Sequence, residues 1–221
     1  MSPTGHVLFW WVAFAGTHLL LSSLPVRQRI VARIGEQPFR GVYSLVSFAT
    51  FVPLVWTYFT HKHTGPLLWA LAMTPVLRWV VYAVMGLAVV LMVASFAQPS
   101  PASVVPGVAT PKGVLRVTRH PLMMAFALFG LAHLVPNGFA TDVVFFGGFT
   151  LFSLIGAWHQ DQRKLALDAG GYRAFHAATP FWPFTGRDTL TGLREMSPVV
   201  MGIGIAVTVL LRYFHAAWFG G

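Results

Sequence analysis

The chain has 221 residues, of which 56% are hydrophobic and 10% are charged, and it has no cysteine. An ordinary soluble domain carries about 25% charged residues, so this composition excludes a soluble enzyme. The absence of cysteine excludes a disulfide scaffold and thiolate ligation of zinc or haem. The mean hydropathy of +0.66 indicates a helical integral membrane protein, provided that the apolar residues fall in runs of about 20.

Six apolar runs, separated by polar segments, are long enough to cross a hydrocarbon core of about 30 Å. The fourth run is the shortest, and the Pro-Asn-Gly turn signal at 136–138 predicts that it forms a tight transmembrane hairpin with the fifth. Residues 67–73 are apolar but too short to span, and we expect them to lie at the surface or to re-enter. The pattern predicts an all-α, polytopic bundle of about six transmembrane helices in one domain, residues 1–221. The runs cover approximately residues 5–24, 41–59, 76–97, 121–136, 139–158 and 196–214.

The basic residues indicate the orientation of the bundle. Of the 15 Lys and Arg residues, only Lys62, Arg78 and Arg212 fall outside the segments that follow the first, third and fifth runs. Basic residues concentrate in cytoplasmic loops, so these segments are predicted to be cytoplasmic and both termini to lie on the non-cytoplasmic side. This distribution accounts for the net charge of +9 without a nucleic-acid partner. We expect the protein in a bacterial inner membrane, in contact with lipid.

Two connecting segments have recognisable character. Residues 98–112 form a Pro-rich segment that predicts an irregular loop. Residues 161–190 read as an amphipathic cytoplasmic segment, whose first part, 161–177, is predicted to be one helix on the membrane surface. The apolar side chains of this helix, which can face lipid or the bundle, are Leu165, Leu167, Tyr172 and Phe175.

Two of the nine histidines, His18 and His133, lie inside apolar runs. An ionisable side chain at membrane depth is costly and indicates a functional site. Helix rise places the two rings at levels that differ by about 8 Å. Two readings stay open: each histidine is a neutral residue hydrogen-bonded across helices, or the pair provides the two axial ligands of a b-type haem. The chain has no Cys-x-x-Cys-His motif, which excludes covalent haem attachment.

Basic residues beside the predicted helix ends are candidates to hold an anion. Arg40 and Arg119, together with Arg27 and Arg116, are candidates to neutralise haem propionates, or they form the cytoplasmic basic belt. His120 precedes a proline that suits the first turn of a helix, where N–H groups favour an anion. Arg119 and His120 are therefore candidates to bind a propionate, a phosphate or a nucleotide, or they are a basic helix entry.

Carboxylates are few. Asp142 lies inside an apolar run, near its outer end. Asp161 lies at the inner end of the same run, between His159 and Arg163. These three residues either bracket a polar site or form a solvated helix end.

In order along the chain, several short blocks resemble those of the NnrU family, whose core is similar to that of plant 15-cis-zeta-carotene isomerases. The likeness covers residues 5–190 approximately, and it is the order and spacing of the blocks that make it specific. The blocks are Thr17-His18-Leu19-Leu20, the segment from Ile34 to Leu45, Val117-Thr118-Arg119-His120-Pro121, Leu131-Ala132-His133-Leu134, Gly156-Ala157-Trp158 and Asp161 to Arg163.

The resemblance implies a membrane protein that binds haem b, with iron ligated by the histidines of the first block and of the Leu-Ala-His block, here His18 and His133. It also implies redox-dependent isomerisation of a 15-cis carotene double bond, with a hydrophobic polyene as substrate and an electron donor that the sequence does not identify. Four aromatic side chains are then expected to line an apolar tunnel: Phe126, Phe129, Phe145 and Phe146.

Two other functions stay open. NnrU proteins are associated with nitric oxide metabolism in denitrifying bacteria, which implies a non-enzymatic haem protein. The segment from Arg119 to Pro121, followed by residues 161–183 with Gly171 and Tyr172, is also similar to isoprenylcysteine carboxyl methyltransferases. Those enzymes use the Arg-His-Pro segment for S-adenosylmethionine, which implies a membrane methyltransferase.

Overall fold

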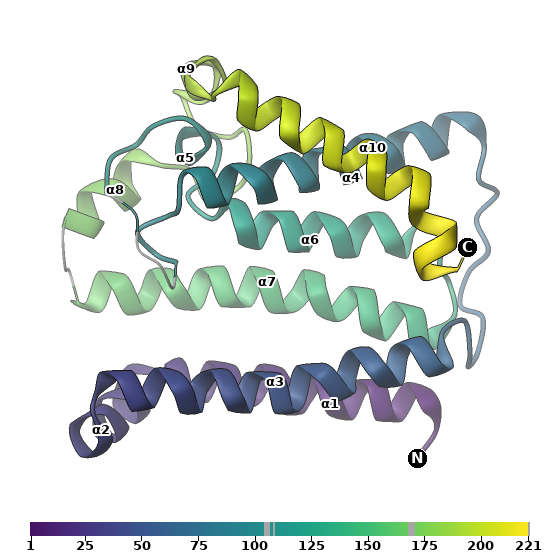
Figure 1. The fold of residues 1–221 in the computed structure, drawn as a ribbon, viewed down its shortest axis with the longest axis horizontal. Coiled ribbons are helices and arrows are strands. Elements are labelled where there is room, and N and C mark those ends of the chain that lie inside the picture. Colours follow the sequence, from purple (N-terminus) through teal and green to yellow (C-terminus); the bar gives the residue numbers. More distant parts are fainter. Residues whose placement is uncertain (104–106, 108, 168–170, 221) are drawn as a thin grey trace. The chain divides into compact units, whose positions relative to one another are not determined.

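The computed structural model describes residues 1–103, 107, 109–167 and 171–220. Within these residues the secondary structure is helical, apart from one isolated antiparallel bridge (Figure 1). The all-α prediction is confirmed. The helices are α1 (Pro3–Ser22), α2 (Leu24–Ile34), α3 (Glu36–His61), α4 (Pro75–Ala97), α5 (Val114–Val117), α6 (Pro121–Leu134), α7 (Ala140–Leu167), α8 (Tyr172–Ala178), α9 (Thr189–Glu195) and α10 (Pro198–Phe219).

Each of the six predicted runs forms a helix. In the described part of the chain, five helices are long and apolar enough to cross a membrane: α1, α3, α4, α7 and α10. Helix α6 is also apolar but has only 14 residues, which corresponds to roughly 21 Å and is shorter than a hydrocarbon core of about 30 Å. The chain is therefore an integral membrane protein with five full-length candidate spans and one shorter apolar helix.

Local sequence signals explain where several helices begin and end. The Ser2 hydroxyl accepts a hydrogen bond from Gly5 N at the start of α1, and the Thr74 hydroxyl accepts one from Leu77 N at the start of α4. In both helices a proline follows the cap, where its missing N–H costs nothing. Gly35 separates α2 from α3 with a φ of +85°, a conformation that side chains with a Cβ disfavour.

The described residues group into two compact units. Unit 1 contains Met1–Ala72 and His133–Phe152, and unit 2 contains Met73–Ala132 and Ser153–Gly221. Helices α6 and α7 therefore contribute residues to both units.

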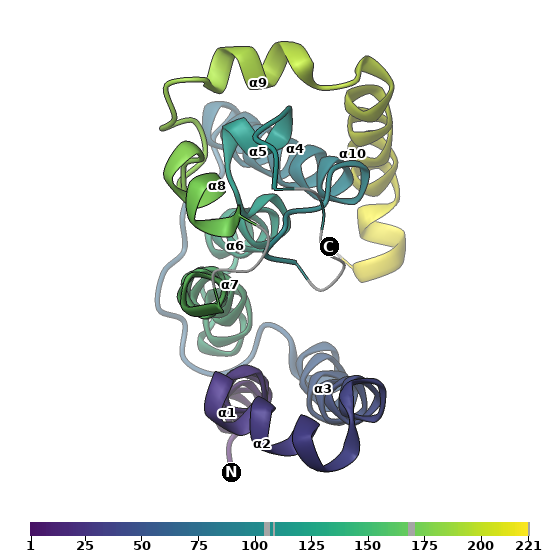
Figure 2. The same cartoon turned by 90° about the vertical axis from the view of Figure 1, so that its left-hand side faces the viewer.

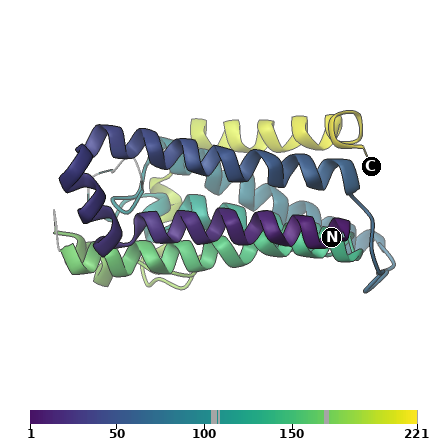
Figure 3. The ribbon, with the colours of Figure 1, turned by 90° about the horizontal axis from the view of Figure 1, so that it is seen from below.

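Aromatic side chains form the core of unit 1. Helices α1 and α3 run along one another, joined by α2 (Figure 3). The Phe14 ring of α1 lies 5.1 Å from Phe51 of α3 and 4.9 Å from Phe152 of α7. Trp11 lies 5.1 Å from the Phe149 ring and donates its indole N–H to the carbonyl of Phe145. These contacts hold α1, α3 and the first part of α7 together.

The segment between α3 and α4 contains residues 67–73, which were expected to lie at the surface or to re-enter. The segment is not helical. Leu68 N donates to Gly138 O at 2.8 Å, and Ala140 N donates to Pro66 O at 2.9 Å. The Trp69 indole donates to Leu134 O at 3.0 Å. Two backbone hydrogen bonds and one from the Trp69 side chain thus hold this segment against the end of α6 and the turn between α6 and α7.

The predicted hairpin of α6 and α7 is present, and two contacts give its register. His120 bonds Asp161 in unit 2, while His133 stacks on Phe146 in unit 1. The residue numbers increase along α6 while those of the contacting residues in α7 decrease, so the two helices are antiparallel.

Unit 2 pairs α4 with α10 and gathers α5, α8 and α9 at one end (Figure 2). Gly204 of α10 allows α10 to lie close to α4, because a Cβ at this position would meet Val90 at 2.9 Å. The core is apolar and includes side chains from segments far apart in sequence. Its buried members are Leu91, Ala94, Ala102, Val114, Leu115, Met124, Ala125, Tyr172, Phe175 and Met196.

The predicted single helix over 161–177 is wrong. Residues up to Leu167 continue α7, and a separate helix, α8, begins at Tyr172. Gly171, with a φ of +75°, precedes the new helix in a left-handed conformation that a continuous α-helix does not contain. Tyr172 and Phe175 are each 1% exposed, so they face the core of unit 2 rather than lipid.

Candidate functional site

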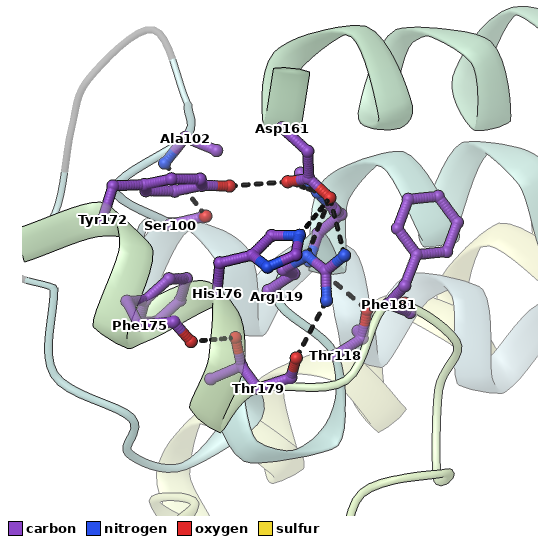
Figure 4. Close-up of polar contacts among 11 residues, drawn as sticks. Ser100, Ala102, Thr118, Arg119, Asp161, Tyr172, Phe175, His176, Thr179 and Phe181 are labelled. Atoms are coloured by element: carbon purple, nitrogen blue, oxygen red, sulfur yellow. Dashed lines mark hydrogen bonds and ion pairs between the residues drawn. The ribbon is translucent and has the colours of Figure 1, made fainter. Parts of the chain in front are cut away.

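A buried carboxylate, Asp161, is the centre of a polar cluster in unit 2 (Figure 4). Arg119 donates to Asp161 Oδ2 through Nε at 2.9 Å and through Nη2 at 2.7 Å. The third guanidinium nitrogen, Nη1, donates to Thr179 O at 2.8 Å. This two-bond pairing balances the charges of two buried ions, which would otherwise be costly.

Three further side chains surround the same carboxylate. His120 Nε2 lies 2.7 Å from Asp161 Oδ1, and the Tyr172 hydroxyl donates to the same oxygen at 2.6 Å. His176 Nε2 lies 3.5 Å from Oδ2, and Figure 4 shows the His176 ring beside the Arg119 guanidinium. The carboxylate accepts, so Nε2 of His120 carries a proton and donates it.

The cluster gives its outer members defined protonation states. Burial and the Asp161 charge raise the pKa of Tyr172 well above its usual range, so its hydroxyl stays a donor. Burial and the Arg119 charge lower the pKa of His176, which favours the neutral imidazole near neutral pH.

Backbone pairing positions Arg119 and His120. Thr118 is extended and bonds Phe181 O through its hydroxyl at 2.7 Å. Arg119 N donates to Pro180 O at 2.9 Å. The chain enters α6 directly afterwards, so the segment before α6 is fixed against the segment after α8. The sequence grouped Arg119 with His120 and treated Asp161 apart from them, and the structure joins all three.

His18 lies in unit 1 among aromatic rings. Its ring centroid is 4.7 Å from Tyr43, 5.2 Å from Phe14 and 5.3 Å from Phe152. Its Nδ1 is 3.2 Å from Ser47 Oγ. The single hydroxyl proton of Ser47 is donated to Tyr43 O at 2.8 Å, so Ser47 must accept from His18. Nδ1 of His18 therefore carries the proton, and Nε2 is the unprotonated nitrogen, as in a metal-binding imidazole.

His133 also lies in unit 1, at the end of α6. Its ring stacks on Phe146, with centroids 4.7 Å apart and planes inclined by 19°. Its carbonyl accepts a hydrogen bond from the Asn137 side chain at 2.8 Å, which fixes the turn that follows.

The two histidines contact α7 at different levels. The α7 partner of His18 is Phe152 and that of His133 is Phe146, six residues earlier, which corresponds to roughly 9 Å along the helix axis. The structure thus does not stack the two rings on one another. This offset agrees with the 8 Å difference in level expected from the sequence.

The donor chemistry of unit 1 fits haem b. Within the residues that the structure describes, no three His, Cys, Asp or Glu side chains gather to hold a metal ion. A haem iron needs fewer protein ligands than a bare ion, because the porphyrin supplies the others. His18 presents the right tautomer in apolar surroundings, and His133 is a second half-buried imidazole of the same unit.

Arg40 lies on α3, three residues before Tyr43. Its Nε bonds Glu36 at 3.1 Å, and the same carboxylate oxygen accepts from Arg27 at 2.5 Å. The side chain of Arg40 is 59% exposed, so it remains accessible to an anion. In contrast, Arg119 and His120 belong to unit 2, where both bond Asp161.

A second polar cluster surrounds Asp142 in unit 1. The sequence singled out Asp142 but did not link it to its partners. This carboxylate is fully buried and accepts from the Tyr58 hydroxyl at 3.1 Å, from His63 N at 3.0 Å and from His63 Nδ1 at 2.9 Å. Tyr58 in turn stacks on Phe145, with ring centroids 3.8 Å apart. Of the expected tunnel residues, Phe145 and Phe146 are thus buried core rings of unit 1, whereas Phe126 is a 38% exposed residue of unit 2.

The chain is similar to two curated plant proteins. It is 26% identical over 191 residues to the chloroplastic 15-cis-zeta-carotene isomerase of Zea mays, covering 80% of this chain and 49% of the relative. It is 26% identical over 197 residues to the protein of the same name from Arabidopsis thaliana, covering 83% and 50%. The chain therefore spans about half the length of the curated relatives it matches.

No solved structure matches the chain. A family model described as NnrU protein matches residues 7–221. Because this match covers nearly the whole sequence, the chain belongs to the NnrU protein family.

Proposed function

We propose that this protein is a membrane isomerase that acts on a cis double bond of a long hydrophobic polyene, with haem b as its cofactor. The names of the two plant relatives support the reaction class, for a chain that spans half of their length. One observation carries the cofactor: the His18 imidazole, whose Nδ1 donates to Ser47, has Nε2 as its unprotonated nitrogen.

His18 and His133 are the residues that would hold the iron. Ser47 fixes the tautomer of His18, and the aromatic rings of Phe14, Tyr43 and Phe152 pack around its ring. Arg40, three residues before Tyr43, is the candidate partner for a propionate. When bound, haem b supplies a redox-active iron, which suits an isomerisation that depends on reduction.

The chemistry asks little else of the protein. A cis-to-trans change moves no atom between molecules, so the site needs no nucleophile and no acid–base pair. It must bind an apolar chain away from water. Stacked aromatic rings such as Phe145 and Tyr58 make the interior of unit 1 apolar, which suits a hydrocarbon substrate.

The cofactor is tested by the absorption spectrum of detergent-purified protein, oxidised and dithionite-reduced, with a pyridine haemochromogen assay. We expect one haem b per chain and a low-spin spectrum that is lost or converted in His18→Ala and in His133→Ala. The control is His6→Ala, an exposed histidine on the same helix as His18. A colourless protein after growth with a haem precursor would overturn the haem assignment, as would unchanged spectra in both variants.

The reaction is tested by adding the protein and a reductant to 15-cis-zeta-carotene in detergent and separating the isomers by chromatography. We expect conversion by the wild type and none by His18→Ala. A haem protein with the expected spectrum but without conversion would overturn the isomerase and favour a non-enzymatic role in nitric oxide metabolism.

A further inference from the structure

Unit 2 contains a pocket of about 340 Å³ beside the Asp161 cluster. This volume lies in the range of small-molecule sites, about 300–1,000 Å³. The lining atoms are almost all apolar, and the lining includes no Asp, Glu, Lys or Arg. His120 is its one ionisable residue. The lining residues are Ser95, Phe96, Pro99, Ser100, Ser103, His120, Pro121, Leu122, Met123 and Gln160.

His120 is the notable polar member of this wall. The residue is only 2% exposed, and its Nε2 is held by Asp161. Among the described residues none bonds its other ring nitrogen, Nδ1. No fully buried side-chain nitrogen or oxygen in the described part of the chain lacks a hydrogen bond, so Nδ1 is accessible, and we assign it to the pocket that His120 lines. A buried, oriented imidazole thus presents one nitrogen to an apolar cavity.

The tautomer of His120 defines what this nitrogen can bind. Nε2 donates its proton to Asp161, and the Asp161 charge is already balanced by Arg119. In the neutral imidazole, Nδ1 is then an acceptor and requires a donor from the ligand. The Ser95 hydroxyl cannot supply it, because it donates to Met92 O at 2.6 Å.

We propose that this pocket binds an apolar alcohol or phenol, whose hydroxyl donates to Nδ1 of His120. The apolar walls favour a hydrocarbon body. A charged ligand would lose its hydration without an opposite charge on the walls. A carotene hydrocarbon lacks the hydroxyl, so this site is separate from the proposed polyene and haem site of unit 1, and it does not depend on that proposal.

The ligand class is tested with dodecanol that carries a mid-chain diazirine, photolysed with the full-length protein in detergent. Labelled peptides are mapped by mass spectrometry. We expect labelling within residues 95–103 and 120–123, with farnesol competing about 2- to 10-fold better than farnesene, the matched hydrocarbon. Equal competition by the two would overturn the hydrogen bond to His120. Competition by S-adenosylmethionine would overturn the apolar class and favour a methyl-donor site.

Two variants separate the pocket from the fold. Leu122→Trp places a larger side chain in the wall of the pocket and changes no residue that bonds Asp161, so it should abolish labelling. Its control, Leu131→Trp, changes a 48% exposed residue on the same helix and should leave labelling unchanged. His120→Phe should remove the preference for farnesol over farnesene. Persistent labelling of the same peptides in Leu122→Trp would overturn the site.

Discussion

The indole of Trp11 on α1 packs against the backbone of Gly148 on α7. A Cβ at position 148 would overlap the indole ring, whereas a Cβ at the neighbouring Gly147 would meet nothing within 4 Å. Trp11 is 5% exposed and also donates to Phe145 O, so it cannot move aside without losing a buried hydrogen bond. The absence of a side chain at 148 therefore sets how closely α1 approaches α7 in unit 1.

Gly148→Ala should destabilise the protein by about 1–3 kcal/mol, the usual cost of overpacking a core. Gly147→Ala is the matched control and should be neutral or stabilising by up to about 1 kcal/mol, because alanine favours the helix. The measurement is the thermal midpoint in detergent, followed by circular dichroism. Equal midpoints for the two variants would show that the Trp11 contact does not limit the approach.

Ser47→Ala should reduce the affinity for haem by about 10- to 100-fold, because the His18 ring loses the partner that fixes its tautomer. Thr50→Ala provides the control on the same helix, since the Thr50 hydroxyl bonds the carbonyls of Val46 and Ser47 within that helix. Haem retention during transfer to apomyoglobin gives the readout. A loss of the same size in Thr50→Ala would attribute the effect to the helix rather than to His18.

Asp161→Asn should destabilise the protein by about 3–5 kcal/mol, because it leaves the buried Arg119 cation without its counter-charge. Asp188→Asn removes the 60% exposed partner of Arg116 and should cost less than about 1 kcal/mol. Thermal midpoints in detergent compare the two. A small effect of Asp161→Asn would mean that Arg119 finds another acceptor.

The stability of unit 2 should depend on the charge of His176. Because burial and Arg119 lower the pKa of His176, the unfolded chain takes up a proton before the folded protein does. The contribution of neutral His176 to the free energy of unfolding is complete above the unfolded pKa of about 6.5. It is lost progressively as the pH falls below that value. His176→Gln should thus lose less of its thermal midpoint between about pH 8 and pH 5.5 than the wild type does. Parallel pH profiles would contradict the lowered pKa.

The sequence predicted the helices well, because their determinants are local. Apolar runs of sufficient length mark α1, α4 and α10, and the turn at 136–138 marks the hairpin. The sequence-based prediction was wrong over residues 161–177, where the spacing of apolar residues indicated one helix. Gly171 was the available signal, since it precedes α8 in a left-handed conformation that a continuous α-helix does not contain, but its φ is set only in the folded chain.

By itself the sequence determined that this is a helical membrane protein. It selected His18 and His133 because they lie inside apolar runs, and Arg119 and His120 as candidates to bind an anion at a helix start. Only the tertiary structure decided the partners. Asp161 lies 41 positions after His120, and the register of α6 against α7 brings them together. The tautomer of His18 likewise depends on Ser47 of another helix. Hydropathy and helix period act over a few residues, whereas a hydrogen bond between helices depends on how they pack.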